Sequence, residues 1–115
     1  MPTSSPAGLP APVAALLAAA NRHDTPAFLA AFTGDGVVDD WGREFRGPDA
    51  VRGWSDAEFI GVGVTLDVTE VTEVTGADAG AVTVLADVGG QGFNGPSHFT
   101  FTVDGDRVSR MTIRA

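Results

Sequence analysis

The hydrophobic residues of this chain have a helical spacing near its start. Val13, Leu16 and Leu17 recur at intervals of three and four residues, which predicts a helix from residue 13 to residues 21–24. A further helix is expected to start at Pro48, because proline is well tolerated at the first helical position.

Another helix is predicted between these two. We expect Thr25 to be its N-cap and Pro26 its first helical residue, with Gly34 ending it. Residues 37–41 then have the composition of a short strand, and residues 42–47 that of a turn and a returning strand.

After Gly61 the hydrophobic residues change to strict alternation. They occupy every second position from Val62 to Val68, which is the pattern of a half-buried strand. The alternation breaks at residues 69–71, and a β-bulge or a bend is the simplest cause. Three more strands, separated by turn-rich segments, are expected at residues 81–88, 97–103 and 107–114.

These elements predict a fold class. Short turns between consecutive strands indicate antiparallel pairing, and the helices precede the long strands in the sequence. We therefore predict one α+β domain over residues 13–115, in which three helices cover one face of a curved antiparallel sheet around a cavity. Residues 1–12 are rich in proline and small residues and have no apolar pattern, so we expect a flexible N-terminal arm.

The composition excludes several kinds of chemistry. The net charge is -8 and the basic residues are scattered, which argues against nucleic-acid binding. The sequence has no Cys, Lys or Tyr, which rules out thiolate, Schiff-base and phenol chemistry. Its two His residues are too few for a histidine-rich metal site, and we expect neither a metal nor a cofactor. Proton transfer is left to Asp, Glu and His.

The apolar stretch APVAALLAAA (residues 11–20) has the composition of a signal-peptide core. No basic residue precedes it, however, and Pro10 and Pro12 interrupt its start. It is also shorter than the roughly 20 apolar residues that cross a bilayer. We therefore expect a helix here, and a cytoplasmic protein that does not associate with membranes.

The stretch GVVDDW (residues 36–41) places two carboxylates at the end of a predicted strand. Side chains alternate along a strand, so Val38 and Asp40 share one face while Asp39 and Trp41 share the other. At most one aspartate therefore points inward. Two interpretations stay open. The aspartates are bound by water or by the nearby Arg43 and Arg46, or one carboxylate lies at the mouth of an apolar cavity, where desolvation would strengthen it as a general base.

Two further motifs lie near the C-terminus. GQGFNG (residues 90–95) matches the spacing of a dinucleotide-binding loop, but a strand rather than a helix follows it, so we expect a hairpin loop at the rim of a cavity. In SHFTFTV (residues 97–103), Ser97 and Phe101 share the core face, where the Ser97 hydroxyl could line a pocket. His98 lies on the opposite face, where a surface or subunit-contact role is expected.

The run LAAANRHDTPAFLAAFTGDGVVDDWGREFRGPDAVRGW (residues 17–54) resembles the first half of small proteins with the nuclear transport factor 2-like, cone-shaped α+β fold. The shared features are an Asp before the second helix, AF near that helix's end, a strand ending in acidic residues, and G-x-x-A-V opening the third helix. This superfamily includes ketosteroid isomerases, SnoaL-type polyketide cyclases and limonene epoxide hydrolases. The resemblance implies the same fold for nearly all of the ordered chain.

The resemblance also implies roles for individual residues. Asp40 takes the position of the proton-shuttling base of ketosteroid isomerases, and Trp54 that of a pocket aromatic on the third helix. Ser97 stands where those enzymes carry a protonated carboxylic acid, and Leu16 where they carry a tyrosine. Both oxyanion donors are thus missing, and each loss costs about 10²–10³ in rate. A reaction like that of polyketide cyclases therefore fits better than steroid isomerisation.

We therefore expect a SnoaL-like homodimer that pairs through the outer face of its sheet and binds a small hydrophobic ligand. An enzyme of this kind would be an isomerase or aldol cyclase that uses Asp40 as its single base, next to a carbonyl. The alternative is a noncatalytic binding or assembly module of the same fold. The expected binding residues are Leu16, Phe28, Trp54, Phe59, Ser97 and Phe101.

Overall fold

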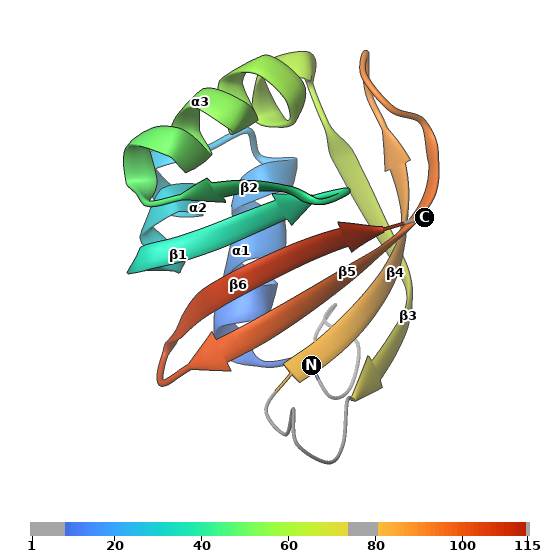
Figure 1. Cartoon of the computed structure of the whole chain (residues 1–115). Helices are drawn as coiled ribbons and strands as arrows, with labels where there is room; N and C mark the ends of the chain where they lie inside the picture. The colour runs from blue at the N-terminus through green and yellow to red at the C-terminus, as the bar shows by residue number, and fades with distance from the viewer. Residues whose placement is uncertain (1–8, 74–80, 115) are drawn as a thin grey trace.

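The computed structural model describes residues 9–73 and 81–114, and in it the helices lie on one side of a single curved sheet (Figure 1). The helices are α1 (Ala11–Asn21), α2 (Thr25–Ala30), α3 (Pro48–Glu58) and the short 3₁₀ helix η1 (Ile60–Val62). The strands are β1 (Phe32–Asp40), β2 (Arg43–Arg46), β3 (Thr65–Glu73), β4 (Ala81–Gly89), β5 (Gly95–Asp104) and β6 (Arg107–Arg114). The predicted α+β class is confirmed.

The two N-terminal helices differ from the prediction at their ends. α1 begins at Ala11 rather than at residue 13. α2 is capped by Asp24, whose carboxylate accepts a hydrogen bond of 3.1 Å from the Ala27 N–H, so the prediction of Thr25 as the N-cap is wrong. Most of the expected arm over residues 1–12 lies outside the described residues.

β1 begins at Phe32, earlier than predicted, and Gly34 lies within this strand instead of ending a helix. A backbone hydrogen bond explains the early end of α2. The Val108 N–H of β6 donates to the Ala31 carbonyl at 2.8 Å, which draws the chain into the sheet. A partner strand that is distant in the sequence therefore overrides the local helical signal.

The strands form one sheet in the order β2-β1-β6-β5-β4-β3. Neighbouring strands are antiparallel except β1 and β6, which run parallel, so the prediction of a wholly antiparallel sheet is corrected to a mixed one. Turn signals indicate only the pairing of strands that follow each other in the sequence. The pairing of β1 with β6 joins opposite ends of the domain and leaves no such signal.

β3 starts later than the alternation suggested. η1 and Gly63, which has a left-handed backbone (φ 72°), first form a turn, and the strand begins at Thr65 rather than at Val62. The predicted bulge is confirmed, because the register of β3 against β4 shifts between Val68 and Glu70.

The hydrophobic core lies between the helices and the inner face of the sheet. α1 packs on β3, β5 and β6, whereas α3 packs on β1 and β2. The fully buried large side chains include Phe28, Phe99, Phe101, Leu16 and Met111. Among residues 9–73 and 81–114, no helix is long and apolar enough to cross a membrane.

Asn21, at the end of α1, ties the helices to the edge of the sheet. Its amide donates to the Leu66 carbonyl at 3.0 Å and accepts from the Leu66 N–H at 2.7 Å. β3 is an edge strand, and its outer backbone groups would otherwise be left to water. The Asn21 amide therefore forms the two backbone hydrogen bonds at Leu66 that a neighbouring strand would otherwise make.

We predict that Asn21→Ala lowers the free energy of unfolding by about 1–2 kcal/mol, because both hydrogen bonds to Leu66 are lost. Urea denaturation followed by circular dichroism measures this change. Asn94→Ala is the control, since the Asn94 amide donates to the carbonyls of Gly90 and Gly92 within its own exposed loop. Equal losses for the two variants would contradict the role given to Asn21.

Candidate functional site

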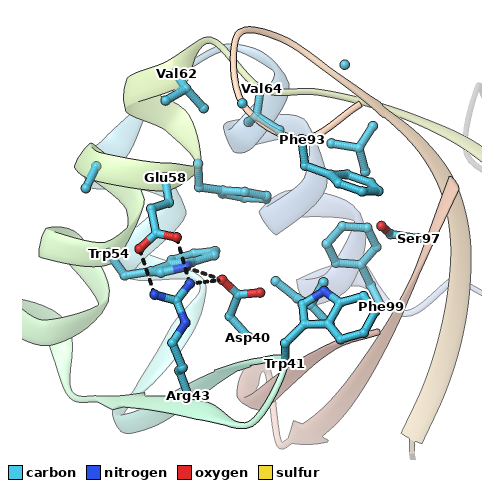
Figure 2. Close-up of a pocket in the computed structure, with 16 residues that line it drawn as sticks. Asp40, Trp41, Arg43, Trp54, Glu58, Val62, Val64, Phe93, Ser97 and Phe99 are labelled. Atoms are coloured by element: carbon cyan, nitrogen blue, oxygen red, sulfur yellow. Dashed lines mark hydrogen bonds and ion pairs between the residues drawn. The ribbon is translucent and has the colours of Figure 1, made fainter. Parts of the chain in front are cut away.

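A pocket of about 500 Å³ opens between α3, the end of the β1–β2 hairpin and the loop that joins β4 to β5 (Figure 2). Its position follows from the packing, because α3 covers β1 and β2 and leaves the facing part of β4 and β5 uncovered. The lining side chains come from β1, the β1–β2 hairpin, α3, η1 and the segments on either side of it, the β4–β5 loop, and strands β4, β5 and β6. They are Asp40, Trp41, Arg43, Trp54, Ala57, Glu58, Phe59, Val62, Val64, Val88, Phe93, Ser97, Phe99 and Ile113, with Gly89 and Gly92.

Asp40 lies at the end of β1 with its carboxylate in the wall of this pocket. One oxygen, Oδ2, accepts hydrogen bonds from Arg43 Nη2 at 2.6 Å and from the Trp54 indole N–H at 3.1 Å. No hydrogen bond within the described part of the chain uses Oδ1. The side chain keeps 16% of its surface exposed. The carboxylate is thus held at one oxygen and open at the other.

Arg43 joins Asp40 to α3. Its guanidinium binds Glu58 through two hydrogen bonds, of 2.6 Å from Nη2 to Oε1 and 3.1 Å from Nη1 to Oε2. The hydrogen bonds to Glu58 and then to Asp40 raise the pKa of Arg43, and the same contact lowers the pKa of Glu58 below its usual value. Arg43 and Glu58 are therefore both charged at neutral pH.

Aromatic rings form one part of the apolar wall of the pocket, beside aliphatic side chains. Trp54 of α3 stacks on Phe59 with 4.8 Å between the ring centroids, and Phe59 lies 6.5 Å from Phe99 of β5. Behind this row, Phe28 packs on Phe59 at 5.6 Å and Phe101 on Phe99 at 6.4 Å. The rings continue from the pocket wall into the core without a break.

The residues proposed from the sequence divide into two groups. Asp40, Trp54, Phe59 and Ser97 all line the pocket, and Figure 2 shows the Ser97 hydroxyl on β5 turned toward the cavity. The other three lie in the core with no exposed surface and form none of the pocket lining. They are Leu16, Phe28 and Phe101.

Trp41 and Phe93 line the pocket although the sequence did not suggest either. They are the exposed large hydrophobic side chains of the described residues, at 58% and 56%. Trp41 and Gly42 form the two-residue turn between β1 and β2, and both have positive φ, 54° and 90°. The predicted strand alternation therefore stops at Asp40, and Trp41 turns to the pocket instead of to the face of Asp39. The glycine that follows Trp41 was the signal in the sequence for this turn.

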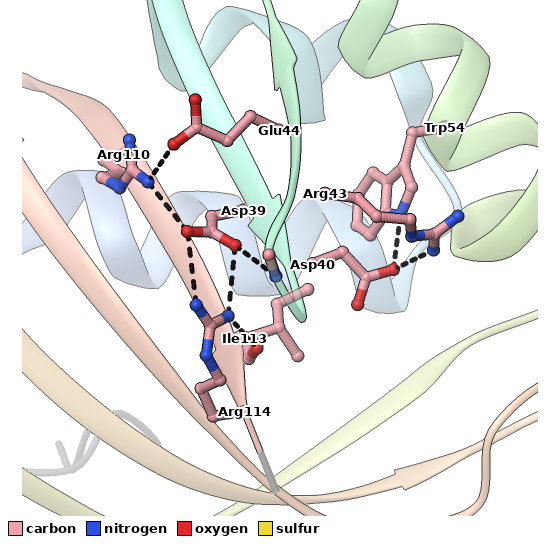
Figure 3. Close-up of polar contacts among 9 residues, drawn as sticks. Asp39, Asp40, Arg43, Glu44, Trp54, Arg110, Ile113 and Arg114 are labelled. Atoms are coloured by element: carbon pink, nitrogen blue, oxygen red, sulfur yellow. Dashed lines mark hydrogen bonds and ion pairs between the residues drawn. The ribbon is translucent and has the colours of Figure 1, made fainter.

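Asp39 points to the opposite face of the sheet from Asp40 (Figure 3). Its carboxylate accepts from Arg110 at 2.8 Å, from Arg114 at 3.1 Å and from the Gly42 N–H at 2.8 Å. Only 7% of the residue is exposed. The outward direction agrees with the alternation along the strand, but Arg110 and Arg114 bind the carboxylate in place of the expected Arg43 and Arg46. Asp39 thereby holds the turn that carries Trp41.

The remaining motifs have simpler positions. His98 is exposed on the outer face of β5. The glycine-rich loop over residues 90–94 connects β4 to β5, and its Gln91 N–H donates to the Val62 carbonyl at 2.8 Å at the pocket rim. Within the described ranges, no three His, Asp or Glu side chains are grouped as a metal site would require.

Comparisons with known proteins agree on one fold. The family model of the SnoaL-like domain matches residues 13–111. No curated protein matches the chain in sequence. A Sinorhizobium meliloti protein assigned as a polyketide cyclase is 27% identical, with a TM-score of 0.81 over 92% of this chain and 95% of its own.

Two structures of complexes share the fold at lower identity. A Mycobacterium tuberculosis protein in complex with estradiol-17beta-hemisuccinate is 17% identical, with a TM-score of 0.72 over 89% of this chain and 88% of its own. A Catenulispora acidiphila protein with a ketosteroid isomerase-like fold, in complex with trimethylamine, is 23% identical, with a TM-score of 0.73 over 92% of this chain and 85% of its own.

We predict that Asp39→Asn destabilises the protein by about 1–2 kcal/mol at neutral pH, because two arginines lose their shared carboxylate. The hydrogen bond from Arg114, more than any other contact, holds the pKa of Asp39 below its ordinary value. The ionised form therefore stabilises the fold above a pH of about 4, and this contribution is lost as the pH falls through the lowered pKa.

The difference in urea midpoint between wild type and Asp39→Asn should accordingly shrink as the pH is lowered below about 4. Asp35→Asn, on an exposed aspartate of the same strand, is the control and should show little effect at any pH. A difference that stays constant down to acidic pH would disprove the role of the Asp39 charge.

Proposed function

The chain belongs to the family of SnoaL-like domains, and we propose that it binds a small hydrophobic, cyclic or polyketide-like molecule in the pocket and acts on it with Asp40 as the general base. One observation carries this proposal. The Oδ1 atom of Asp40 has no donor among residues 9–73 and 81–114 and lies at the wall of a pocket that is otherwise lined mainly by aromatic and aliphatic side chains, while Oδ2 is held by two donors.

The reaction class is proton abstraction from a carbon next to a carbonyl, leading to isomerisation or aldol cyclisation. Arg43 and Trp54 fix the carboxylate through Oδ2, so that Oδ1 can accept a proton without a change in the side-chain position. Ser97 would orient the carbonyl with its hydroxyl, and Trp54 and Phe59 would hold the ring system. No cofactor takes part in this chemistry.

The residues in the core have a supporting place in this proposal. Phe28 packs behind Phe59, and Phe101 behind Phe99, so the two buried rings keep the pocket wall in position. Leu16 of α1 fills the same core. Ligand affinity would therefore depend on these residues only indirectly.

Relatives of the same fold support ligand binding. One neighbour is assigned as a polyketide cyclase, and another was crystallised with a steroid ester. The rival function is a noncatalytic binding module, in which Asp40 only anchors the ligand. It uses the same pocket, so chemistry at the ligand must separate the two.

We also propose that the protein is a cytoplasmic homodimer that pairs through the outer face of its sheet. The helices leave this face of β4, β5 and β6 uncovered (Figure 1). Its centre carries uncharged side chains, including a Thr83–Thr100 hydroxyl pair at 3.0 Å, with His98 nearby. A stable dimer buries about 800 Å² on each partner, which a face of three long strands can supply.

For catalysis, we predict that the wild-type protein accelerates deuterium exchange at the carbons next to the carbonyl of 2-tetralone, measured by NMR in D₂O. Asp40→Asn should slow the exchange by about 10²-fold or more, because the base is lost. Asp35→Asn, a carboxylate of the same strand outside the pocket lining, should exchange like wild type.

The two tryptophans are Trp41 and Trp54, the sequence has no Tyr, and both tryptophans line the pocket. Their fluorescence therefore reports ligand binding directly. Binding of 2-tetralone without exchange would favour the noncatalytic rival. No binding to 2-tetralone or to related ring compounds would overturn the proposal itself.

For the dimer, we predict that His98→Glu shifts the protein toward monomer in sedimentation equilibrium, because two carboxylates would face each other across the interface. Ala18→Glu is the control, since it adds the same charge on the exposed side of α1. A monomeric wild-type protein, or equal shifts in both variants, would contradict the proposed interface.

A further inference from the structure

We propose that the pocket selects ring compounds that carry an ammonium group over neutral and anionic compounds of the same shape. This inference rests on the proposed function, since it names the class of ligand for the same pocket. It is drawn from the charges and the aromatic faces around the cavity.

The charged side chains that line the pocket are Asp40, Arg43 and Glu58. Two carboxylates and one guanidinium leave an excess of one negative charge. Arg43 gives both N–H groups of Nη2 and one of Nη1 to the two carboxylates, so its positive charge is already compensated. An anionic ligand would meet no uncompensated cation there, and a cationic ligand would meet one uncompensated carboxylate.

The aromatic rings favour the same kind of ligand. Five aromatic side chains line the pocket, and an ammonium group near the face of an indole or phenyl ring is attracted by the ring quadrupole. Trp41 and Phe93 stand at the mouth, where they are more than half exposed. Figure 2 shows both rings on the side of the cavity opposite α3, across from the Asp40–Arg43–Glu58 cluster.

The free oxygen of Asp40 gives the ligand its orientation. Oδ1 is an acceptor without a donor among the described residues, and it has two lone pairs, so one can accept an ammonium N–H while the other stays available for the proton taken from carbon. The ring system of the ligand would then lie along Trp54, Phe59 and Phe99. A carboxylate at the same place would face a like charge and leave Oδ1 without a donor.

A positive charge on the substrate also suits the proposed chemistry. When Asp40 takes a proton from the carbon next to a carbonyl, the C–H electron pair is delocalised onto the carbonyl oxygen. The substrate becomes an enolate and the carboxylate becomes a neutral carboxylic acid. On an ammonium-bearing substrate this enolate makes a zwitterion, whose internal charge offsets the new negative charge. Such compensation within the substrate lowers the free energy of the enolate in a pocket lined mainly by apolar side chains.

The experiment uses three probes with one bicyclic skeleton: 2-aminotetralin, which is a cation at neutral pH, neutral 2-tetralone, and anionic tetralin-2-carboxylate. Tryptophan fluorescence and isothermal titration calorimetry give their affinities. We expect the cation to bind about tenfold or more tightly than the anion, with the ketone between them. Equal affinities, or tighter binding of the anion, overturn this inference but leave ligand binding intact. If none of the three binds, the proposed function fails as well.

Two pairs of variants separate the causes. Glu58→Gln removes the excess charge at the pocket, so the preference for the cation over the anion should fall several-fold. Glu44→Gln is the matched control, because this substitution removes the same charge from the whole protein but away from the pocket. Glu44 pairs with Arg110 on the other side of the sheet. A fall of the same size in both variants would show a non-local charge effect and overturn the inference.

Trp41→Leu tests the aromatic contribution. This substitution should lower the affinity for 2-aminotetralin by about threefold to tenfold more than the affinity for 2-tetralone. Leucine keeps the apolar contact but has no ring quadrupole. Phe93→Leu provides the second test at the other ring of the mouth. If both variants lower the affinities for the cation and for the ketone equally, the rings act by apolar contact alone and the aromatic part of the inference is wrong.

Discussion

The position of the final residues of β1 between two partner strands is the constraint on which this site depends. Asp39 and Asp40 are paired with β2 on one side and with β6 on the other, in a single register. Because strand residues alternate between faces, this register sends two identical side chains to opposite environments. A shift by one residue would exchange their faces, and the carboxylate of Asp40 would leave the pocket.

The two aspartates show how the environment decides the use of a side chain. Asp39 is surrounded by arginine donors and a backbone N–H, so both of its oxygens are occupied and its role is structural. Within the part of the chain that the structure describes, Asp40 is held through one oxygen only, by Arg43 and Trp54, and its other oxygen faces a cavity. A general base needs a fixed position and an accessible lone pair, and only the second arrangement provides both.

The pocket is a continuation of the core rather than a separate structure. The row of rings from Phe101 through Phe99 and Phe59 to Trp54 passes from fully buried positions to the cavity wall. Charges are confined to one side, where the ion pairs of Arg43 connect the hairpin to α3. The pocket thus has an apolar wall on one side and a compact polar cluster on the other. Such an arrangement fits a site that holds an apolar molecule and orients it through one polar group of that molecule.

The sequence alone determined the α+β class, the bulge in β3 and the opposite directions of Asp39 and Asp40, because these follow from periodicity and alternation within single elements. It also led to four pocket residues, Asp40, Trp54, Phe59 and Ser97. Only the tertiary structure decided the parallel β1–β6 pair, the early start of β1, the core position of Phe28 and the turn of Trp41 into the pocket. The first three features depend on partners distant in the chain, which no local pattern encodes. The last depends on a positive-φ turn, for which the glycine after Trp41 is the one local signal.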